Sequence, residues 1–354
     1  MDTLTQHNIA PDDHRLNWLG AISLHKENGW VQPWRIPYEE RALFPPTTLQ
    51  ERAAMPAGVR ITFQSTTTSL SCSYEPADDL SPLDMFCDGE LIQTVSLAER
   101  DSITIDGLST NDKHFELWLP QHGIFRLRSL TIDATATIRY LPDTRPRWVT
   151  YGSSITQCRT AASPSKTWPA IVARQLGLNL TCLGYGGQCH LDPLIAQMIR
   201  ELPADFLSLC VGINIYGASS LSSRTFVPML LGFIRIIREK HPTTPCIVMS
   251  PIYSPSREKQ PNAVNMTLHD VRLAVQEVVG ILQSCGDEYL LYIDGLDIFG
   301  PDLVHLLPDG LHPDAEGYKR LGYRFIKYAA WPFWKSHLPE TAVSRQSRMT
   351  PESA

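Results

Sequence analysis

The spacing of apolar residues changes near the middle of this 354-residue chain, and that change restricts the class of fold. Residues 58–140 alternate apolar and polar positions, which is typical of β-strands with one buried face. Residues 148–331 instead alternate short apolar runs with longer stretches of helical spacing. The segment between them, "LPDTRPR" at 141–147, holds two prolines and three charged residues. It predicts a boundary between two domains.

The first half carries strand signals and no long helical pattern. "VRITFQS" alternates apolar and polar residues from Val59 to Phe63, and "HFELWLP" and "IFRLRSLTID" do the same. "MFCDGELIQTV" places Asp88 and Gly89 between two apolar runs, which is the usual sequence of a tight hairpin turn. Many short strands predict a jelly-roll-like β-sandwich over residues 1–145. The start of this half is expected to add edge strands and a covering loop.

The second half predicts a parallel sheet covered by helices, over residues 146–336. Thr167 and Thr267 are placed to cap two helices, and a third helical stretch contains Pro228. Strands that alternate with helices form parallel sheets, which bind ligands beyond the carboxyl ends of their strands. The strand candidates are short apolar runs at 148–151, 179–183, 206–211, 246–250 and 289–293, and the helix candidates are 167–176, 224–239, 267–282 and 316–331.

The first of these predicted strands ends in "WVTYGSSITQ" at 148–157, where an apolar run stops at a glycine and two serines. Ser154 can point its hydroxyl into the ligand crevice there, so it is the candidate nucleophile. Without a base the hydroxyl is only a weak nucleophile, and Gly-Ser-Ser is also common in turns. The Gly-x-Ser-x-Gly elbow of α/β-hydrolases is not matched, because Thr156 occupies its last position.

"LPDGLHPDAEGY" at 307–318 contains a candidate base and acid. Asp309 and His312 lie three positions apart in a loop before a predicted helix. A histidine can accept the proton of a serine while a carboxylate orients its other ring nitrogen. The alternative interpretation needs no chemistry, because Asp-Gly is a common turn and His312-Pro313 can begin a helix.

Two further loops follow strands of the same predicted sheet. In "LCVGINIYG", the Asn214 amide could donate a hydrogen bond to a developing oxyanion. In "NLTCLGYGGQCH", Gly184, Gly186 and Gly187 could bring backbone N–H groups close to a ligand. Both residue types also occur in ordinary turns. No G-x-G-x-x-G or Walker motif is present here, so a nucleotide site is not predicted. Together, these loops place the groups that acyl transfer requires at one edge of one sheet.

The order of these segments resembles that of the SGNH, or GDSL-like, hydrolase superfamily over about residues 147–335. "YGSSIT" is similar to the family's nucleophile block, "YGGQ" to its oxyanion-glycine block, "VGIN" to its Gly-x-Asn block and "DGLHP" to its Asp-x-x-His block. The resemblance implies a flavodoxin-like three-layer fold. It also implies the following site: a Ser154, Asp309 and His312 triad, with an oxyanion hole made by Ser154, Gly187 and Asn214.

Two positions depart from the family pattern. Ser153 and Ile215 stand where the family usually has aspartate. The second change removes a polar contact that can help to hold the loop of Asn214 in the family.

The resemblance implies a serine esterase that hydrolyses short acyl esters, such as acetyl esters of a carbohydrate or a small metabolite, through an acyl-enzyme. A β-sandwich before such a domain is similar to two-domain carbohydrate esterases, so a role in binding substrate or carbohydrate is expected for residues 1–145. Two alternatives remain open. An acyltransferase or thioesterase of a biosynthetic pathway would use the same triad, and a carbohydrate-binding protein could have lost its activity.

Composition narrows the expected partners and location. The net charge is −6 without a basic cluster, so no nucleic-acid partner is expected. The start of the chain lacks a secretion signal, and no apolar run reaches about 18 residues, so a cytoplasmic location without membrane contact is expected.

The eight cysteines form no Cys-x-x-Cys pair, which predicts buried thiols and no metal site. The triad needs no cofactor. Residues 337–354 lack periodicity and are expected to form a mobile tail.

Overall fold

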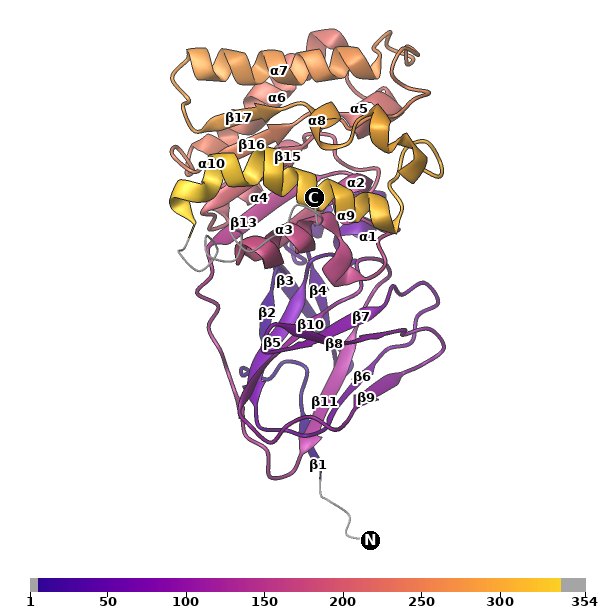
Figure 1. Cartoon of the computed structure of the whole chain (residues 1–354), viewed down its shortest axis with the longest axis vertical. Coiled ribbons are helices and arrows are strands. Elements are labelled where there is room, and N and C mark those ends of the chain that lie inside the picture. Colours follow the sequence, from indigo (N-terminus) through magenta and orange to yellow (C-terminus); the bar gives the residue numbers. More distant parts are fainter. Residues whose placement is uncertain (1–5, 339–354) are drawn as a thin grey trace. The chain divides into compact units, whose positions relative to one another are not determined.

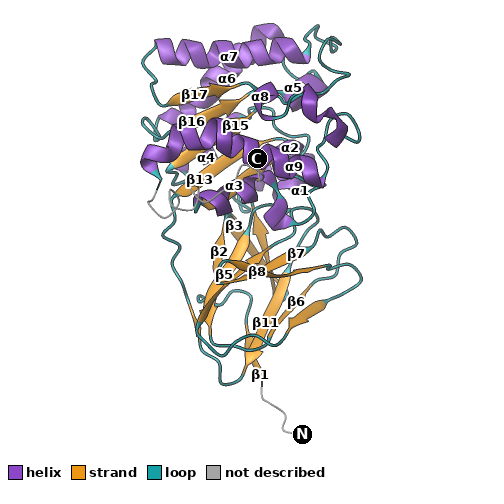
Figure 2. Ribbon diagram, viewed as in Figure 1, coloured by secondary structure: helices purple, strands orange, loops and turns teal. Residues whose placement is uncertain are grey.

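The computed structural model describes residues 6–338, which fall into two compact units (Figures 1 and 2). One unit extends to Thr144 and includes Ser163–Ser165, and the other comprises Arg145–Ala162 and the described chain from Lys166 onward. The tail predicted over 337–354 lies, from residue 339 on, outside the described residues.

The first unit consists of two antiparallel six-stranded sheets. One sheet has the order β3-β4-β11-β6-β9, with β1 paired to β11. The other has the order β12-β5-β10-β7-β8, with β2 paired to β5. The strands are β1 (Gln6–Ile9), β2 (Asn17–Leu19), β3 (Ser23–Glu27), β4 (Trp30–Trp34), β5 (Arg60–Ser65), β6 (Leu70–Tyr74), β7 (Leu83–Cys87), β8 (Glu90–Val95), β9 (Ser102–Ile105), β10 (Lys113–Trp118), β11 (Leu127–Asp133) and β12 (Ile138–Arg139).

The inward side chains of both sheets form one hydrophobic core, as alternation along the strands predicts. Phe63 of β5 and Phe115 of β10 stack with ring centroids 5.0 Å apart. Asp88 and Gly89 join β7 to β8 with φ angles of 51° and 84°, the conformation that the predicted hairpin turn requires. The predicted β-sandwich is therefore confirmed. The prediction for the start of the chain was incomplete, because β4 lies inside its sheet and a helix, α1 (Thr47–Ala53), follows it.

The second unit contains a five-stranded parallel sheet in the order β14-β13-β15-β16-β17, which confirms the predicted α/β domain. β15 and β16 are buried throughout and β13 in all but its first residue, as expected for a sheet covered on both faces. The strands are β13 (Arg147–Gly152), β14 (Asn179–Gly184), β15 (Phe206–Cys210), β16 (Cys246–Met249) and β17 (Leu290–Ile293).

Helices cover both faces of this sheet (Figure 2). The α3 and α9 helices pack on each other, whereas α6 packs against both α4 and α7. The α-helices of this unit are α2 (Ser154–Gln157), α3 (Trp168–Leu176), α4 (Pro193–Glu201), α5 (Ile213–Ala218), α6 (Ser223–Arg238), α7 (Leu268–Ser284), α8 (Gly295–Ile298), α9 (Ala315–Phe325) and α10 (Trp331–Trp334). A π-helix, Ile326–Ala330, joins the last two, and short 3₁₀ helices lie at Pro301–Leu306 and Lys335–His337. Two more 3₁₀ helices lie elsewhere, one in the first unit at Arg41–Leu43 and one at Pro164–Lys166, which spans the boundary between the units.

Both predicted threonine caps are present. Thr167 accepts a hydrogen bond from Ala170 N at 3.3 Å at the start of α3. Thr267 exchanges side-chain and backbone hydrogen bonds with Asp270 at the start of α7. Local hydrogen bonds therefore mark where these two helices begin.

An aromatic cluster supports β13, the strand that leads to Ser154. Trp148 is fully buried among Trp168, Phe325 and Trp334, with ring centroids 5.7–6.2 Å away. Its indole N–H donates to Ser208 Oγ of β15 at 3.1 Å, so the one polar atom of the ring is satisfied. Large rings packed around a strand resist displacement because interiors are close-packed.

The cysteines follow the prediction of buried thiols with two exceptions. All eight are free within the described chain. Cys285 is exposed because it caps the C-terminus of α7, and Cys87 is half-buried at the end of β7. In the described part of the protein, no helix combines the length and the apolar character needed to cross a membrane.

Candidate active site

Ser154 lies at the carboxyl end of β13, where the strand gives way to α2. Ser153 caps this helix, with its Oγ accepting a hydrogen bond from Ile155 N at 3.2 Å. The helix lies so close to β14 that a Cβ on Gly184 would stand 2.4 Å from the Gln157 backbone nitrogen. Gly184 therefore allows α2, and the serine at its start, to approach the sheet closely.

The structure brings Ser154, His312 and Asp309 into one hydrogen-bonded chain. Ser154 Oγ lies 2.9 Å from His312 Nε2, although 158 positions separate the two residues. His312 Nδ1 lies 2.6 Å from Asp309 Oδ2. A proton on Nδ1 donates to the carboxylate, which leaves Nε2 as the acceptor for the serine hydroxyl. This is the hydrogen-bond order that a nucleophile, a base and an orienting acid require.

The backbone around Asp309 makes its carboxylate a strong acceptor. Its Oδ1 accepts hydrogen bonds from Leu311 N at 2.9 Å and from His312 N at 2.7 Å. Burial by itself would raise the pKa of Asp309, but the hydrogen bonds from the His312 side chain and from both backbone N–H groups outweigh it and lower the pKa to about 2. Asp309 is therefore a carboxylate at every pH at which the protein is expected to act.

Other contacts fix the His312 loop, residues 307–314, to the start of the domain. Thr160 Oγ1 donates to Pro313 O at 2.8 Å. Tyr318 of α9 places its hydroxyl 3.5 Å from Ser154 O. Asp314 caps α9 by accepting a hydrogen bond from Gly317 N at 2.8 Å. The loop is thus tied both to the segment after α2 and to the helix that follows it.

The predicted oxyanion donors follow strand ends that lie at the same level of the sheet. Gly152 of β13 pairs with Gly184 of β14 and with Cys210 of β15, so the loop of Gly187 and the first turn of α5, which carries Asn214, follow strand ends beside Ser154. Cys189 N, in the loop of Gly187, donates to Asn214 Oδ1 at 3.0 Å.

That bond fixes the Asn214 amide, because its oxygen is occupied and its NH₂ group is left as a donor. The support that an aspartate at position 215 would supply is absent, since Ile215 is fully buried in the core. The hydrogen bond from Cys189 N supports the amide instead.

The structure also distinguishes Gly187 from Gly186 as a possible donor. Gly186 N donates to Gln157 Oε1 at 2.9 Å and is therefore occupied. The backbone N–H groups of Gly187 and Ser154 make no hydrogen bond within the described residues. Gly187 has a φ of +74°, which favours glycine. The geometry thus favours Gly187 over Gly186 as a free donor.

Two supporting residues were missed by the sequence reasoning. Gln157 is 3% exposed and holds the glycine loop through Gly186. His190 bridges the same loop to the end of α5, with Nε2 3.0 Å from Gly187 O and Nδ1 2.8 Å from Ser220 Oγ. Gln157 directly follows "YGSSIT", but nothing in the pattern says that its side chain turns inward. His190 carries no sequence signal that separates it from a surface histidine.

The described residues contain no group of three or more His, Cys, Asp or Glu side chains that could hold a metal ion. The residues gathered here are instead those of proton transfer and acyl transfer: a hydroxyl, an imidazole, a carboxylate and three N–H donors.

Comparisons with known proteins match both units. The model of the SsfX3 N-terminal domain matches residues 16–128, and that of the GDSL-like Lipase/Acylhydrolase family matches residues 145–328. Among solved structures, the chain is similar to a salicylyl-acyltransferase, SsfX3, from a tetracycline biosynthetic pathway. Identity is 35%, the match covers 92% of this chain and 97% of that one, and the TM-score is 0.86.

Two esterase structures share the fold. A family two carbohydrate esterase from Cellvibrio japonicus is 12% identical over 93% of this chain and 99% of its own, with a TM-score of 0.62. An acetyl xylan esterase from the rumen bacterium Butyrivibrio proteoclasticus is 12% identical over 93% and 98%, with a TM-score of 0.60. At such identity the likeness concerns the fold alone. A comparison with curated proteins gives no match.

Proposed function

The chain belongs to the GDSL-like lipase/acylhydrolase family of enzymes, and from that premise we propose that it is a serine acyltransferase. It moves a small or aromatic acyl group from an activated ester or thioester to the hydroxyl group of a small molecule. Ser154 carries the acyl group between the two steps, and water in place of the acceptor gives ester hydrolysis.

The first step uses the hydrogen-bonded chain described above. His312 Nε2 takes the proton of Ser154 as its oxygen attacks the acyl carbonyl, and Asp309 stabilises the imidazolium. The backbone N–H groups of Ser154 and Gly187 and the amide of Asn214 stabilise the oxyanion. His312 then protonates the leaving group, and the acyl-enzyme remains.

The second step reverses these roles. The acceptor hydroxyl gives its proton to His312 and attacks the acyl-enzyme carbonyl. Collapse of the second intermediate returns a proton to Ser154 and releases the new ester. Each proton that His312 accepts is given up within the same step, so the enzyme returns to its starting state.

One observation carries the preference for transfer over hydrolysis: the 35% identity to an acyltransferase extends over both units of the chain. The acetyl-ester hydrolysis on carbohydrate that the sequence first suggested has less support, because the esterases named above share only the fold. The same holds for a carbohydrate-binding role of the first unit, which matches the SsfX3 N-terminal domain. The cytoplasmic location stays a prediction.

The test follows the fate of the acyl group. Acetyl and salicylyl thioesters of N-acetylcysteamine serve as donors, and methyl glucoside and cyclohexane-1,2-diol serve as acceptors. Mass spectrometry then counts new ester against free acid. We expect ester product whose share rises with acceptor concentration, and no turnover by Ser154→Ala. Free acid alone with every acceptor would indicate an esterase. No acyl release by the wild-type protein would indicate a binding protein.

Asn214→Ala should lower kcat about 10²–10³-fold, which is the usual effect of losing one oxyanion donor. Asn214→Asp provides the matched comparison, because it retains an oxygen for Cys189 N but removes the NH₂ group. Both variants should lose activity if the amide donates to the oxyanion. Wild-type kcat for Asn214→Asp would show that Asn214 acts only by holding the loop. The measurement is the initial rate of nitrophenol release from nitrophenyl acetate.

A further inference from the structure

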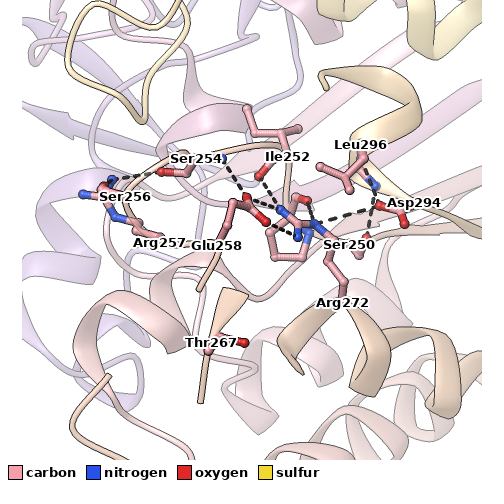
Figure 3. Close-up of polar contacts among 12 residues, drawn as sticks. Ser250, Ile252, Ser254, Ser256, Arg257, Glu258, Thr267, Arg272, Asp294 and Leu296 are labelled. Atoms are coloured by element: carbon pink, nitrogen blue, oxygen red, sulfur yellow. Dashed lines mark hydrogen bonds and ion pairs between the residues drawn. The ribbon is translucent and has the colours of Figure 1, made fainter. Parts of the chain in front are cut away.

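A charged pair between the buried Arg272 and the half-buried Glu258 organises the loop that follows β16 (Figure 3). The Arg272 side chain of α7 is 3% exposed and that of Glu258 is 16% exposed. Two guanidinium nitrogens of Arg272 donate to the two carboxylate oxygens of Glu258 at 2.6 and 2.7 Å. Arg272 also donates to Pro251 O at 2.8 Å and to Ile252 O at 3.2 Å. Paired charged hydrogen bonds fix geometry strongly, so this loop is anchored to α7.

The same network orients the fully buried Ser254. Its backbone N–H donates to Glu258 Oε1 at 3.0 Å, as the dashed lines of Figure 3 indicate. Arg257 Nη1 donates to Ser254 Oγ at 2.9 Å. Because that oxygen accepts a hydrogen bond from Arg257, the serine's own hydrogen is available to another acceptor. That acceptor is Gly310 O, 2.7 Å away.

Gly310 lies between Asp309 and His312 in the loop that carries the proposed acid and base. The side chains of Asp309 and His312 are 55% and 32% exposed, so they receive little packing support of their own. The φ of Gly310 is +73°, and its N–H donates to Leu307 O at 3.0 Å. The Ser254 hydroxyl thus links this exposed loop to the loop that Arg272 and Glu258 anchor to α7.

We propose that Ser254 is a positioning residue of the reaction, an inference that rests on the proposed function. Its hydroxyl holds Gly310 and thereby keeps His312 Nε2 within hydrogen-bonding distance of Ser154 Oγ. Without this bond the loop can move so that the imidazole is misplaced. A misplacement of about 1 Å can lower a rate by as much as about 10²-fold.

The test compares Ser254→Ala with Ser256→Ala. Ser256 belongs to the same loop and is exposed, and its Oγ lies 3.4 Å from Arg257 Nη1. Ser254→Ala should lower kcat for nitrophenyl acetate about 10- to 100-fold and leave KM within about 2-fold. The reason is that the His312 imidazole loses its alignment with Ser154, whereas binding of the ester does not depend on Ser254. Ser256→Ala should leave both constants unchanged. Ser254→Cys, of similar size but a weak donor, replaces Ser254→Ala if that variant does not fold.

A second measurement follows the loop itself. Hydrogen–deuterium exchange of the peptide covering 307–314 should speed up about 10-fold or more in Ser254→Ala and not in Ser256→Ala, because a lost anchor favours local opening. Unchanged kcat, a rise in KM alone, or unchanged exchange would each overturn the inference. If the wild-type protein shows no turnover that depends on Ser154, the proposed function fails. The exchange measurement then decides alone whether Ser254 anchors the loop.

Discussion

Ser154→Ala is expected to lower kcat for acyl release on the order of 10⁶-fold, to a level set by binding and the remaining donors. The reason is that, among residues 6–338, Ser154 supplies the one hydroxyl in hydrogen-bond contact with His312, whose Nε2 lies 2.9 Å from Ser154 Oγ. The measurement is nitrophenol release, combined with intact-mass detection of a fluorophosphonate adduct. Wild-type protein should gain one adduct, and Ser154→Ala none.

Ser153→Ala is the matched control for this result. Ser153 is adjacent and 2% exposed, but its Oγ caps α2 through Ile155 N rather than contacting His312. Its loss should cost about 1 kcal/mol of stability, the usual value of a helix cap, with labelling retained. Labelling of Ser154→Ala, or an unlabelled native wild-type protein, would contradict the proposed role of Ser154. The second result would favour a binding protein.

The fold could be predicted from local patterns because its strands and turns are encoded locally. The Asp88-Gly89 turn and the Thr167 and Thr267 caps each depend on residues a few positions apart, and all three formed as expected. β4 was harder to predict because Pro33 lies inside it, and proline usually indicates an edge strand or none. β4 can contain Pro33 because β4 pairs with β11 at a single register position, Leu127 with Val31.

In the candidate site, only residues whose type and motif indicate a catalytic role could be predicted from the sequence. Ser154, Asp309 and His312 could be proposed from their motifs, and the structure brings their side chains together. Supporting residues such as Gln157 and Ser254 could not, because each acts through hydrogen bonding to a loop far away in the sequence. Such a bond depends on where two loops meet, which no periodicity encodes.

Asp309→Asn should lower kcat about 10⁴-fold. Asparagine keeps an oxygen for Leu311 N and His312 N, so the loop can retain its conformation. Its NH₂ group, however, would face His312 Nδ1 and favour the tautomer that carries the proton on Nε2. That tautomer cannot accept the proton of Ser154, and the imidazolium also loses its carboxylate partner.

The pH dependence of kcat tests whether Asp309 stays ionised over the working range. Although burial would raise it, the pKa of Asp309 is lowered to about 2, so the carboxylate stays charged down to that pH. The stability that this lowered pKa contributes is present above the ordinary value of about 3.9 and is lost as pH falls through about 2. Between about pH 8 and about pH 4, Asp309 therefore does not titrate. The loss of kcat in Asp309→Asn relative to wild type should therefore be present across this whole pH range.

Asp302→Asn is the control, because it removes an exposed carboxylate paired with Arg324 at 2.6 Å and should leave kcat unchanged. If Asp309→Asn retained kcat within about tenfold of wild type, His312 would not need Asp309 to set its tautomer. The 2.6 Å contact between them would then serve only to shape the loop. A loss restricted to the upper part of this pH range would contradict the lowered pKa, since it would mean that the wild-type carboxylate is already protonated at the lower end of the working range.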